Sequence, residues 1–243
     1  MEIPKKVLVI IPAYNEEQNI QRVVENLLQN DPSCDYIIVN DGSTDHTADI
    51  CRANHYPLID QPVNLGLAGA FQTGMKYAYQ QGYDAALQFD ADGQHLPQYI
   101  RPMADKLEAG SDVVIGSRFL EKKKPFSARM AGSFLISAAI RLTTGQKLTD
   151  PTSGMRMYNK QMIAKFAQRI NYGPEPDTIS YLMKSGANVK EVQVEMADRI
   201  AGESYLNIAN SIRYMLRMGI SILLVQAFRG SDKLCKEGEE IDI

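Results

Sequence analysis

Apolar runs alternate with amphipathic stretches along the first half of the chain. The apolar runs predict strands over 6–11, 35–40, 57–60, 84–89 and 112–116. The stretches between them have helical spacing and predict helices over 17–30, 45–54, 67–81 and 97–109. This alternation is typical of an α/β fold with a mainly parallel sheet and helices on both of its faces.

Several of these predicted elements carry signals at their ends. Thr44 or Asp45 is placed to cap the second helix, and Pro97 suits the first turn of the fourth. The first apolar run stops at Pro12 without a small-residue cleavage site, so we interpret it as a strand and not as a signal peptide. We therefore expect the protein to stay inside the cell.

The chain changes character after Arg118. A basic loop at 121–126 precedes a predicted helix over 128–144, and a second helical stretch covers 208–228. Each stretch holds an uncharged run of 11 residues, which is too short to cross a bilayer as a helix. Each is either an ordinary buried helix or a helix that lies in a membrane surface.

Position and charge favour the membrane surface for the second stretch. Arg213, Arg217, Arg229 and Lys233 surround an Ile-Leu-Leu-Val cluster there. Such a helix can bury its apolar face in lipid while its cations meet anionic head groups.

The length of 243 residues and a hydrophobic fraction of 44% fit one α/β domain with its own core. We expect this domain over 1–205 and an amphipathic helix over 206–230. The remaining segment, 231–243, is expected to be a disordered tail.

Charge and cysteine content exclude several classes of protein. A net charge of -3 argues against a nucleic-acid-binding protein, which usually has a strongly basic face. Cys34, Cys51 and Cys235 are widely spaced and lack any Cys-x-x-Cys, so neither a disulfide framework nor a zinc site is indicated.

Two carboxylates and an amide follow the predicted strand 84–89. Asp90, Asp92 and Gln94 stand at alternate positions, so their oxygens can converge on one divalent metal, Mg²⁺ or Mn²⁺. We expect Asp92 as first ligand and Gln94 as second, with Asp90 supporting the metal or holding sugar and ribose hydroxyls. Phosphates of a nucleotide diphosphate would complete the shell, and the metal would act on this leaving group as a Lewis acid. His95 is a candidate supporting residue.

Polar loops also follow two other predicted strands. The loop 12–16 follows the first strand, and the loop 40–45 follows the second. Ligands of open parallel α/β sheets bind at the carboxyl ends of the strands, so these loops should meet the Asp90 loop at one edge. The sequence therefore predicts a nucleotide site there.

The segments Pro-Ala-Tyr-Asn-Glu at 12–16, Asn-Asp-Gly-Ser-Thr-Asp at 40–45 and Asp-Ala-Asp at 90–92 resemble the family-two inverting glycosyltransferases of the GT-A fold. Further segments resemble the dolichyl-phosphate mannose synthase branch, and more closely its short bacterial members that load sugars onto undecaprenyl phosphate. These segments are 64–66, 116–118, 150–156 and 199–204. Such enzymes often have Lys after their Gly-x-Ser element, where this chain has Tyr205, a departure that bears on the sugar or the acceptor.

The resemblance implies roles for individual residues. The implied donor-binding residues are Pro12, Ala13, Tyr14, Glu16, Asp41, Gly66, Asp90 and Ala91. Asp41 would accept a hydrogen bond from the base or else be a turn residue, and Glu16 would line the base pocket or place its charge in a first helical turn. The implied catalytic residues are Asp90, Asp92, Arg118, Arg129 and Arg199. The guanidinium groups of the three arginines suit phosphates. The 150–154 turn is expected to shape the acceptor site.

We expect an inverting glycosyltransferase that moves one sugar from a UDP- or GDP-linked donor to a polyprenyl phosphate such as undecaprenyl phosphate, for cell-surface glycan synthesis. The acceptor phosphate is largely ionised at pH 7 and needs no base. A glycan hydroxyl as acceptor is the alternative, and it would need Glu175 or Asp177 as base, residues that could otherwise cap the helix at 178–184. A nucleotide-sugar-binding protein without catalysis is the third hypothesis.

The expected place of such an enzyme is the inner face of the cell membrane, as a peripheral protein. Its partners would be the nucleotide sugar, the polyprenyl phosphate lipid and the membrane surface. A small integral-membrane partner or a second copy of the chain stays open as a further partner.

Overall fold

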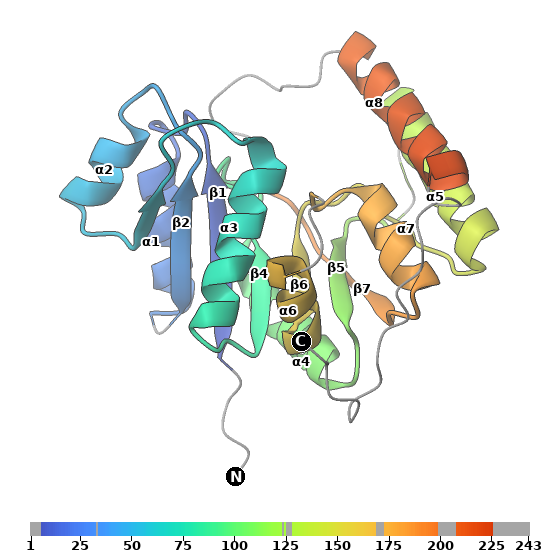
Figure 1. The fold of residues 1–243 in the computed structure, drawn as a ribbon, viewed down its shortest axis with the longest axis horizontal. Coiled ribbons are helices and arrows are strands. Elements are labelled where there is room, and N and C mark those ends of the chain that lie inside the picture. The colour runs from blue at the N-terminus through green and yellow to red at the C-terminus, as the bar shows by residue number, and fades with distance from the viewer. Residues whose placement is uncertain are drawn as a thin grey trace.

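The protein is an α/β fold built on one mostly parallel sheet (Figure 1). The computed structural model describes residues 6–32, 34–122, 124, 128–168, 173–198 and 208–225. Within these ranges the sheet has seven strands in the order β3-β2-β1-β4-β6-β5-β7. The strands are β1 (Val7–Ala13), β2 (Asp35–Asn40), β3 (Leu58–Asp60), β4 (Ala85–Gln88), β5 (Val113–Ser117), β6 (Arg156–Asn159) and β7 (Val189–Gln193).

Helices cover both faces of this sheet. In chain order the helices up to β5 are α1 (Ile20–Asn30), α2 (Thr47–Ala53), α3 (Gly66–Gln80), the 3₁₀ turn η1 (Pro97–Tyr99) and α4 (Ile100–Glu108). The helices after β5 are α5 (Ala128–Thr144), α6 (Lys160–Gln168), α7 (Pro176–Lys184) and α8 (Ile208–Ile220), which continues as a π-helical turn, η2 (Ser221–Val225). The α/β class with a mainly parallel sheet and helices on both faces, predicted from the sequence, is confirmed.

The strands and helices predicted in the first half of the chain are present with shifts of a few residues. The N-cap of α2 is His46, which makes no capping bond with its side chain, so the cap predicted at Thr44 or Asp45 is wrong in position. Asp45, one residue earlier, still accepts the backbone N–H of Thr47 at 3.0 Å through its Oδ1. Pro97 takes the first position of η1. The elements β6, α6 and β7 were not predicted from the hydrophobic pattern, and β6 runs antiparallel to both of its neighbours.

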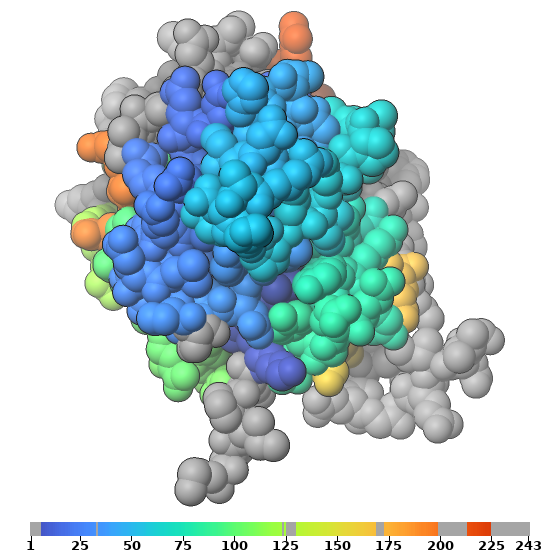
Figure 2. All heavy atoms as spheres, turned by 90° about the vertical axis from the view of Figure 1, so that its left-hand side faces the viewer, coloured from blue at the N-terminus to red at the C-terminus, as the bar shows by residue number. Residues whose placement is uncertain are grey.

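Alternate residues of the central strands feed two separate hydrophobic cores. Leu8 and Ile10 of β1 face the core that α3, α5, α6 and α7 cover, whereas Val9 and Ile11 face the core under α1, α2 and α4. Figure 2 looks at the end of the molecule formed by α2 and its neighbours, where the chain segments up to α3 lie together. The pleat of β1 thus ties both helical layers to one sheet.

The helices α5 and α8 pack against each other at the far end from α2 (Figure 1). A Cβ added at Gly132 of α5 would lie only 2.5 Å from Met215 Cγ of α8, so glycine permits the close approach. Met218 and Ile222 on the α8 side are buried in the core.

Both helices also expose apolar side chains on their other side. The exposed residues of this apolar face are Phe134, Leu135, Leu142, Leu216, Ile220, Leu223 and Leu224. The sequence left open whether each of these helices is buried or lies in a membrane surface. In the structure each helix has one side buried in the core and one side with exposed apolar side chains. Among the described residues no helix has the length and apolar character needed to span a membrane. The predicted tail 231–243 lies outside the described residues.

Candidate active site

The loops that follow β1 and β2 interlock at the carboxyl edge of the sheet. Asn15 has a φ of +55° and its Oδ1 accepts the Thr44 N–H at 2.8 Å, while its own N–H donates to Ser43 Oγ at 2.9 Å. Glu16 donates its N–H to Thr47 Oγ1 at 2.8 Å. These bonds hold the two loops as one surface, with Ala13 buried beneath it.

The Glu16 carboxylate lies outside the first helix. Its Oε2 accepts a hydrogen bond from Asn19 Nδ2 at 2.8 Å, and α1 begins only at Ile20 with no acidic residue in its first turn. The alternative that placed its charge in a first helical turn is therefore wrong. The helix predicted from residue 17 starts later because Glu16 and Asn19 form a turn before it.

Asp41 lies 3% exposed beneath the loop that connects β3 to α3. Its Oδ1 accepts the Leu65 N–H at 2.7 Å. Gly42 has a φ of +65°, and a Cβ there would lie 2.7 Å from the backbone of Val63 and Asn64. Gly66, the first residue of α3, is therefore held next to the β2 loop, at the same edge as the other implied donor-binding residues.

Asp90 and Asp92 follow β4 and present oxygen atoms at this edge. Asp90 Oδ1 accepts from Gln88 Nε2 at 3.0 Å, and Asp92 Oδ1 accepts the Gln94 N–H at 3.0 Å. Ala91 between them is buried. The amide nitrogen of Gln94 donates to Ala197 O at 3.4 Å, so its oxygen is the atom available to a cation.

This oxygen set fits a divalent metal that shares its shell with a substrate. The described part of the chain contains no group of three His, Cys, Asp or Glu that could hold a metal by itself. Mg²⁺ takes one or two carboxylates from a protein and completes its shell with water and phosphate oxygens. Two carboxylates and an amide oxygen meet that requirement.

His95 supports Asp90 from beneath. Its Nδ1 accepts the Asp90 N–H at 2.9 Å, so in the neutral ring the proton is on Nε2, which faces Asp90 Oδ2 at 3.6 Å. The ring is 3% exposed and meets the Phe89 ring edge-on at 5.4 Å. His95 thus restrains the backbone of Asp90.

The antiparallel strand β6 brings the 150–154 turn to Asp90. Gln88 pairs with Arg156, so two residues beyond this pair the chain places Gly154 beside Asp90. A Cβ at Gly154 would lie 2.6 Å from Asp90 Oδ2. The turn that the sequence analysis connected with the acceptor therefore touches the loop that it connected with the metal.

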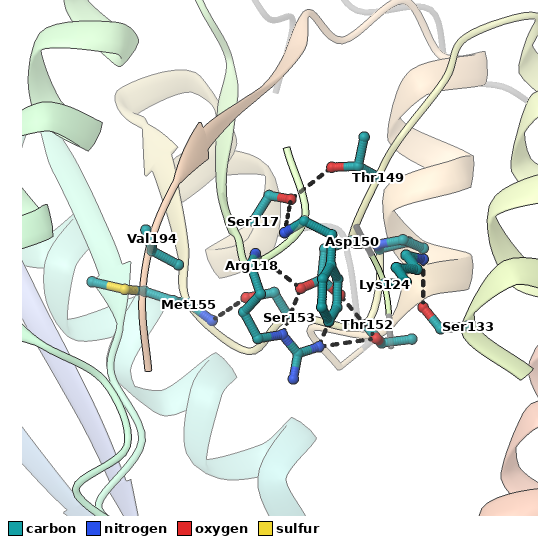
Figure 3. A network of polar contacts seen from close by, with 12 residues as sticks. Ser117, Arg118, Lys124, Ser133, Thr149, Asp150, Thr152, Ser153, Met155 and Val194 are labelled. Atoms are coloured by element: carbon teal, nitrogen blue, oxygen red, sulfur yellow. Dashed lines mark hydrogen bonds and ion pairs between the residues drawn. The ribbon is translucent and has the colours of Figure 1, made fainter. Parts of the chain in front are cut away.

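Arg118 and Asp150 form a two-pronged ion pair at the end of β5 (Figure 3). Arg118 donates from Nε to Oδ2 at 2.6 Å and from Nη2 to Oδ1 at 2.9 Å. Asp150 is fully buried, whereas the Arg118 side chain is 29% exposed. The pair fixes the guanidinium plane, and within the described ranges Nη1 has no hydrogen-bond partner.

Glu191 of β7 fixes the backbone that carries Asp150. Its carboxylate accepts the N–H groups of Thr149 and Asp150, both at 2.8 Å, and the Thr149 hydroxyl at 2.9 Å. Ser117 and Thr149 share a hydrogen bond of 2.6 Å between their hydroxyls (Figure 3). The position of Arg118 thus depends on β5, β7 and the turn together.

Arg156 is a structural residue of the site that the sequence analysis did not single out. It is 1% exposed and donates to three backbone carbonyls, those of Ser153 at 2.9 Å, Pro151 at 2.7 Å and Pro174. It therefore ties the 150–154 turn to the loop before α7. Its place inside the 150–156 segment was the only signal in the sequence.

The two candidate bases contact the C-terminal helices. Tyr214 Oη donates to Glu175 Oε2, and Ser221 Oγ donates to Asp177 Oδ2 at 2.6 Å. Burial, and then the charge of Glu175, raises the pKa of Tyr214, which keeps this hydroxyl a neutral donor. Glu175 occupies the N-cap position of α7 but makes no capping bond with its side chain, so the capping role weighed for it is wrong.

Some predicted residues cannot be placed. Arg199, the 199–204 segment and Tyr205 lie outside the described residues. The backbone of Arg129 belongs to the first turn of α5, but its side chain is also outside the described part.

Comparisons with known proteins identify the family. Residues 8–166 match Glycosyl transferase family 2. The chain therefore belongs to this family, and the family assignment made from the sequence is confirmed.

Its relatives include enzymes named for polyprenyl phosphates. The chain is 30% identical over 215 residues to the undecaprenyl-phosphate mannosyltransferase of Micrococcus luteus, covering 83% of this chain and 88% of that protein. It is 32% identical to the UDP-N-acetylglucosamine–dolichyl-phosphate N-acetylglucosaminyltransferase of Methanococcus voltae, covering 79% of this chain and 85% of the relative.

Among solved structures, glucosyl-3-phosphoglycerate synthase from Mycobacterium tuberculosis, in complex with Mn²⁺, UDP-glucose and phosphoglyceric acid, has the same fold. The TM-score is 0.69 at 17% identity, over 94% of this chain and 82% of that chain, and the GT-A fold predicted from the sequence is confirmed.

Proposed function

We propose that this glycosyltransferase moves a single sugar from a nucleotide-sugar donor to a polyprenyl phosphate, with inversion at the anomeric carbon. The observation that carries the proposal is the contact between Gly154 and Asp90. It puts the turn that anchors a phosphate-type cation, Arg118, directly against the loop for the donor diphosphate. The names of the relatives support the same acceptor class, and undecaprenyl phosphate is the acceptor to try first.

On the donor side, the loops 12–16 and 40–45 would hold the base, with Asp41 as its hydrogen-bond partner. Asp92, Gln94 and Asp90 would hold Mg²⁺ or Mn²⁺, whose bound form would offset the charge of the leaving nucleotide diphosphate. His95 keeps Asp90 in place for this role. The donor can be UDP- or GDP-linked, since both carry the diphosphate that these residues would meet.

On the acceptor side, Arg118 would bind the lipid phosphate, and Arg129 and Arg199 are proposed to join it. The Asp150 carboxylate holds the Arg118 guanidinium in one orientation, so little of its rotamer freedom is left to lose on binding. A phosphate monoester is already ionised at pH 7 and attacks without a protein base.

A glycan hydroxyl as acceptor is the alternative, and the contacts of its candidate bases speak against it. Both Glu175 and Asp177 accept hydrogen bonds from side chains of α8 and η2. A base must be within reach of the substrate hydroxyl, and these bonds serve the packing of helices instead.

Amide variants test the choice between the two acceptors. Glu175→Gln and Asp177→Asn keep the shape of each side chain but remove its basicity. We expect both variants to retain activity within about fivefold of wild type, because neither side chain acts as a base in this proposal. Loss of a true general base would lower the rate by roughly 10² to 10⁴. A loss of a hundredfold or more with an unchanged melting temperature would favour the hydroxyl acceptor.

We also propose that the apolar face of α5 and α8 lies in the inner surface of the cell membrane. Exposed Arg141, Arg213 and Arg217 on the same helices would meet anionic head groups. Such an arrangement brings the enzyme to a lipid acceptor. A second copy or a small integral-membrane protein is the competing occupant of this face.

Vesicle binding tests this placement. The double variant Leu216→Gln, Ile220→Gln should bind anionic vesicles at least about tenfold more weakly, because two buried apolar side chains are worth about 3 kcal/mol or more. Tyr79→Gln at the far end of α3 is the control for an exposed apolar residue elsewhere. Unchanged co-sedimentation would contradict the proposal, and a dimer that the double variant loses would point to a second copy.

A further inference from the structure

Lys124 holds a partly buried ammonium group beside the Arg118 cluster. It follows β5 and precedes α5, and its Nζ donates to Ser133 Oγ at 3.0 Å (Figure 3). Ser133 belongs to α5 and is fully buried. Nζ also lies 5.5 Å from the centre of the Phe119 ring. The amine is thus held in place by a hydroxyl and an aromatic face.

No anionic partner balances this group in the described part of the chain, where no carboxylate oxygen lies within 4.0 Å of Nζ. The nearby carboxylates are already engaged, Asp150 by Arg118 and Glu191 by backbone N–H groups. Burial lowers the pKa of Lys124, an effect that Asp150 and Glu191 oppose and Arg118 reinforces. A half-buried cation without an ion-pair partner is costly, and a bound anion would remove that cost.

Arg118 and Lys124 approach the same aromatic ring. The Arg118 guanidinium carbon lies 5.2 Å from the centre of the Phe119 ring. The Arg118 charge is paired with Asp150, so Lys124 brings a further positive charge that has no ion pair among the described residues. A phosphate has enough oxygens to accept hydrogen bonds from both Arg118 and Lys124. The lysine ammonium group is a compact point charge and can bind a phosphate oxygen from several directions.

The surroundings of Lys124 indicate whether its phosphate ligand would belong to the donor or to the acceptor. The donor loops follow β1, β2 and β4, whereas Lys124 lies on the β5 side and contacts α5. Directly after Ser133 on α5 come Phe134 and Leu135, 67% and 66% exposed. A ligand with a phosphate head and an apolar tail matches a cation next to an exposed apolar helix.

We propose that Lys124 is a ligand for the acceptor phosphate and binds it together with Arg118. This proposal rests on the proposed function, since it assumes a lipid phosphate as acceptor. Lys124 then contributes to acceptor affinity and not to donor binding. The neighbouring Lys122 has no such role, because it pairs with Glu195 on the exposed surface.

Steady-state kinetics of Lys124→Gln test the proposal, with undecaprenyl phosphate presented in non-ionic detergent micelles so that no anionic head group interferes. Loss of a charged hydrogen bond predicts a KM for the acceptor that rises roughly tenfold to a hundredfold. The KM for the donor stays unchanged, and Lys124→Arg recovers most of the acceptor affinity. Lys122→Gln removes the same charge from the same loop and serves as the control, with no change in either KM.

The possible outcomes distinguish a failure of the Lys124 proposal from a failure of the proposed function. If wild type transfers sugar to the lipid but the acceptor KM of Lys124→Gln stays within twofold, Lys124 is not a ligand, although the function stands. A rise in the donor KM instead would assign Lys124 to the diphosphate and overturn the proposal. If wild type transfers no sugar to the lipid, both fail together. Melting curves accompany each variant, and Lys124→Met replaces the Gln variant if that one is unstable.

Discussion

Gly154→Ala is expected to impair catalysis while leaving the fold intact. The backbone of Gly154 is outside the left-handed region, so alanine adds no backbone strain. Its Cβ would, however, lie 2.6 Å from Asp90 Oδ2 and 3.4 Å from His95 Cε1. Since ordinary contact begins at 3.4 Å, the carboxylate must move by about 0.8 Å, and a displacement of this size can cost about a hundredfold in rate.

The effect should fall on turnover and not on stability. Asp90 is 36% exposed, so its side chain can turn towards solvent without disturbing the core. The assay follows nucleotide release and sugar transfer at saturating donor and metal, together with the melting temperature. Gly219→Ala, where a Cβ would meet nothing within 4 Å, is the matched control. Activity within threefold of wild type would refute the claim that the turn fixes Asp90.

Two further predictions concern stability. Arg156→Met leaves three buried carbonyls without a hydrogen-bond donor, so the free energy of unfolding should fall by about 3 kcal/mol or more. This corresponds to a drop of roughly 6–12 °C in melting temperature. Calorimetry that shows no drop would contradict the structural role of Arg156. Asp45→Ala should cost about 1 kcal/mol at pH 7 in urea unfolding, because it removes the hydrogen bonds that Asp45 accepts from Thr47 and Glu17. Burial raises the pKa of Asp45, but hydrogen bonds from Thr47 and Glu17 outweigh it and hold the pKa below its ordinary 3.8. The Asp45 carboxylate therefore stabilises the folded state above pH 3.8 and loses this effect as the pH falls through the lowered value. A stability difference that does not change with pH would contradict this.

The first half of the fold followed from the hydrophobic pattern because its strands are apolar and its helices amphipathic. The strand β6 escaped this reasoning because it has only four residues and begins with a fully buried arginine, Arg156. A sequence pattern treats arginine as a surface residue, whereas three carbonyls make its burial possible here. Sequence reasoning also missed β7, in which Lys190, Glu191 and Gln193 outnumber the apolar positions.

The residue types of the site were predictable, but their contacts were not. Asp90, Asp92 and Arg118 stand at strand ends, where local pattern alone points to a ligand. The contact of Gly154 with Asp90 depends on an antiparallel strand inserted between β4 and β5, which no local signal indicated. Lys124 read as one more charge of a basic loop, because its burial depends on Phe119 and Ser133 meeting in space.

Transfer of label into lipid tests the central claim most directly. Purified protein would receive labelled UDP and GDP sugars one at a time, with Mg²⁺ or Mn²⁺ and undecaprenyl phosphate, and label would be counted in the organic phase. The account predicts transfer from one donor, lost on adding a chelator and in Asp92→Asn. Nucleotide release without label in the organic phase would contradict it and bring the glycan-hydroxyl alternative forward.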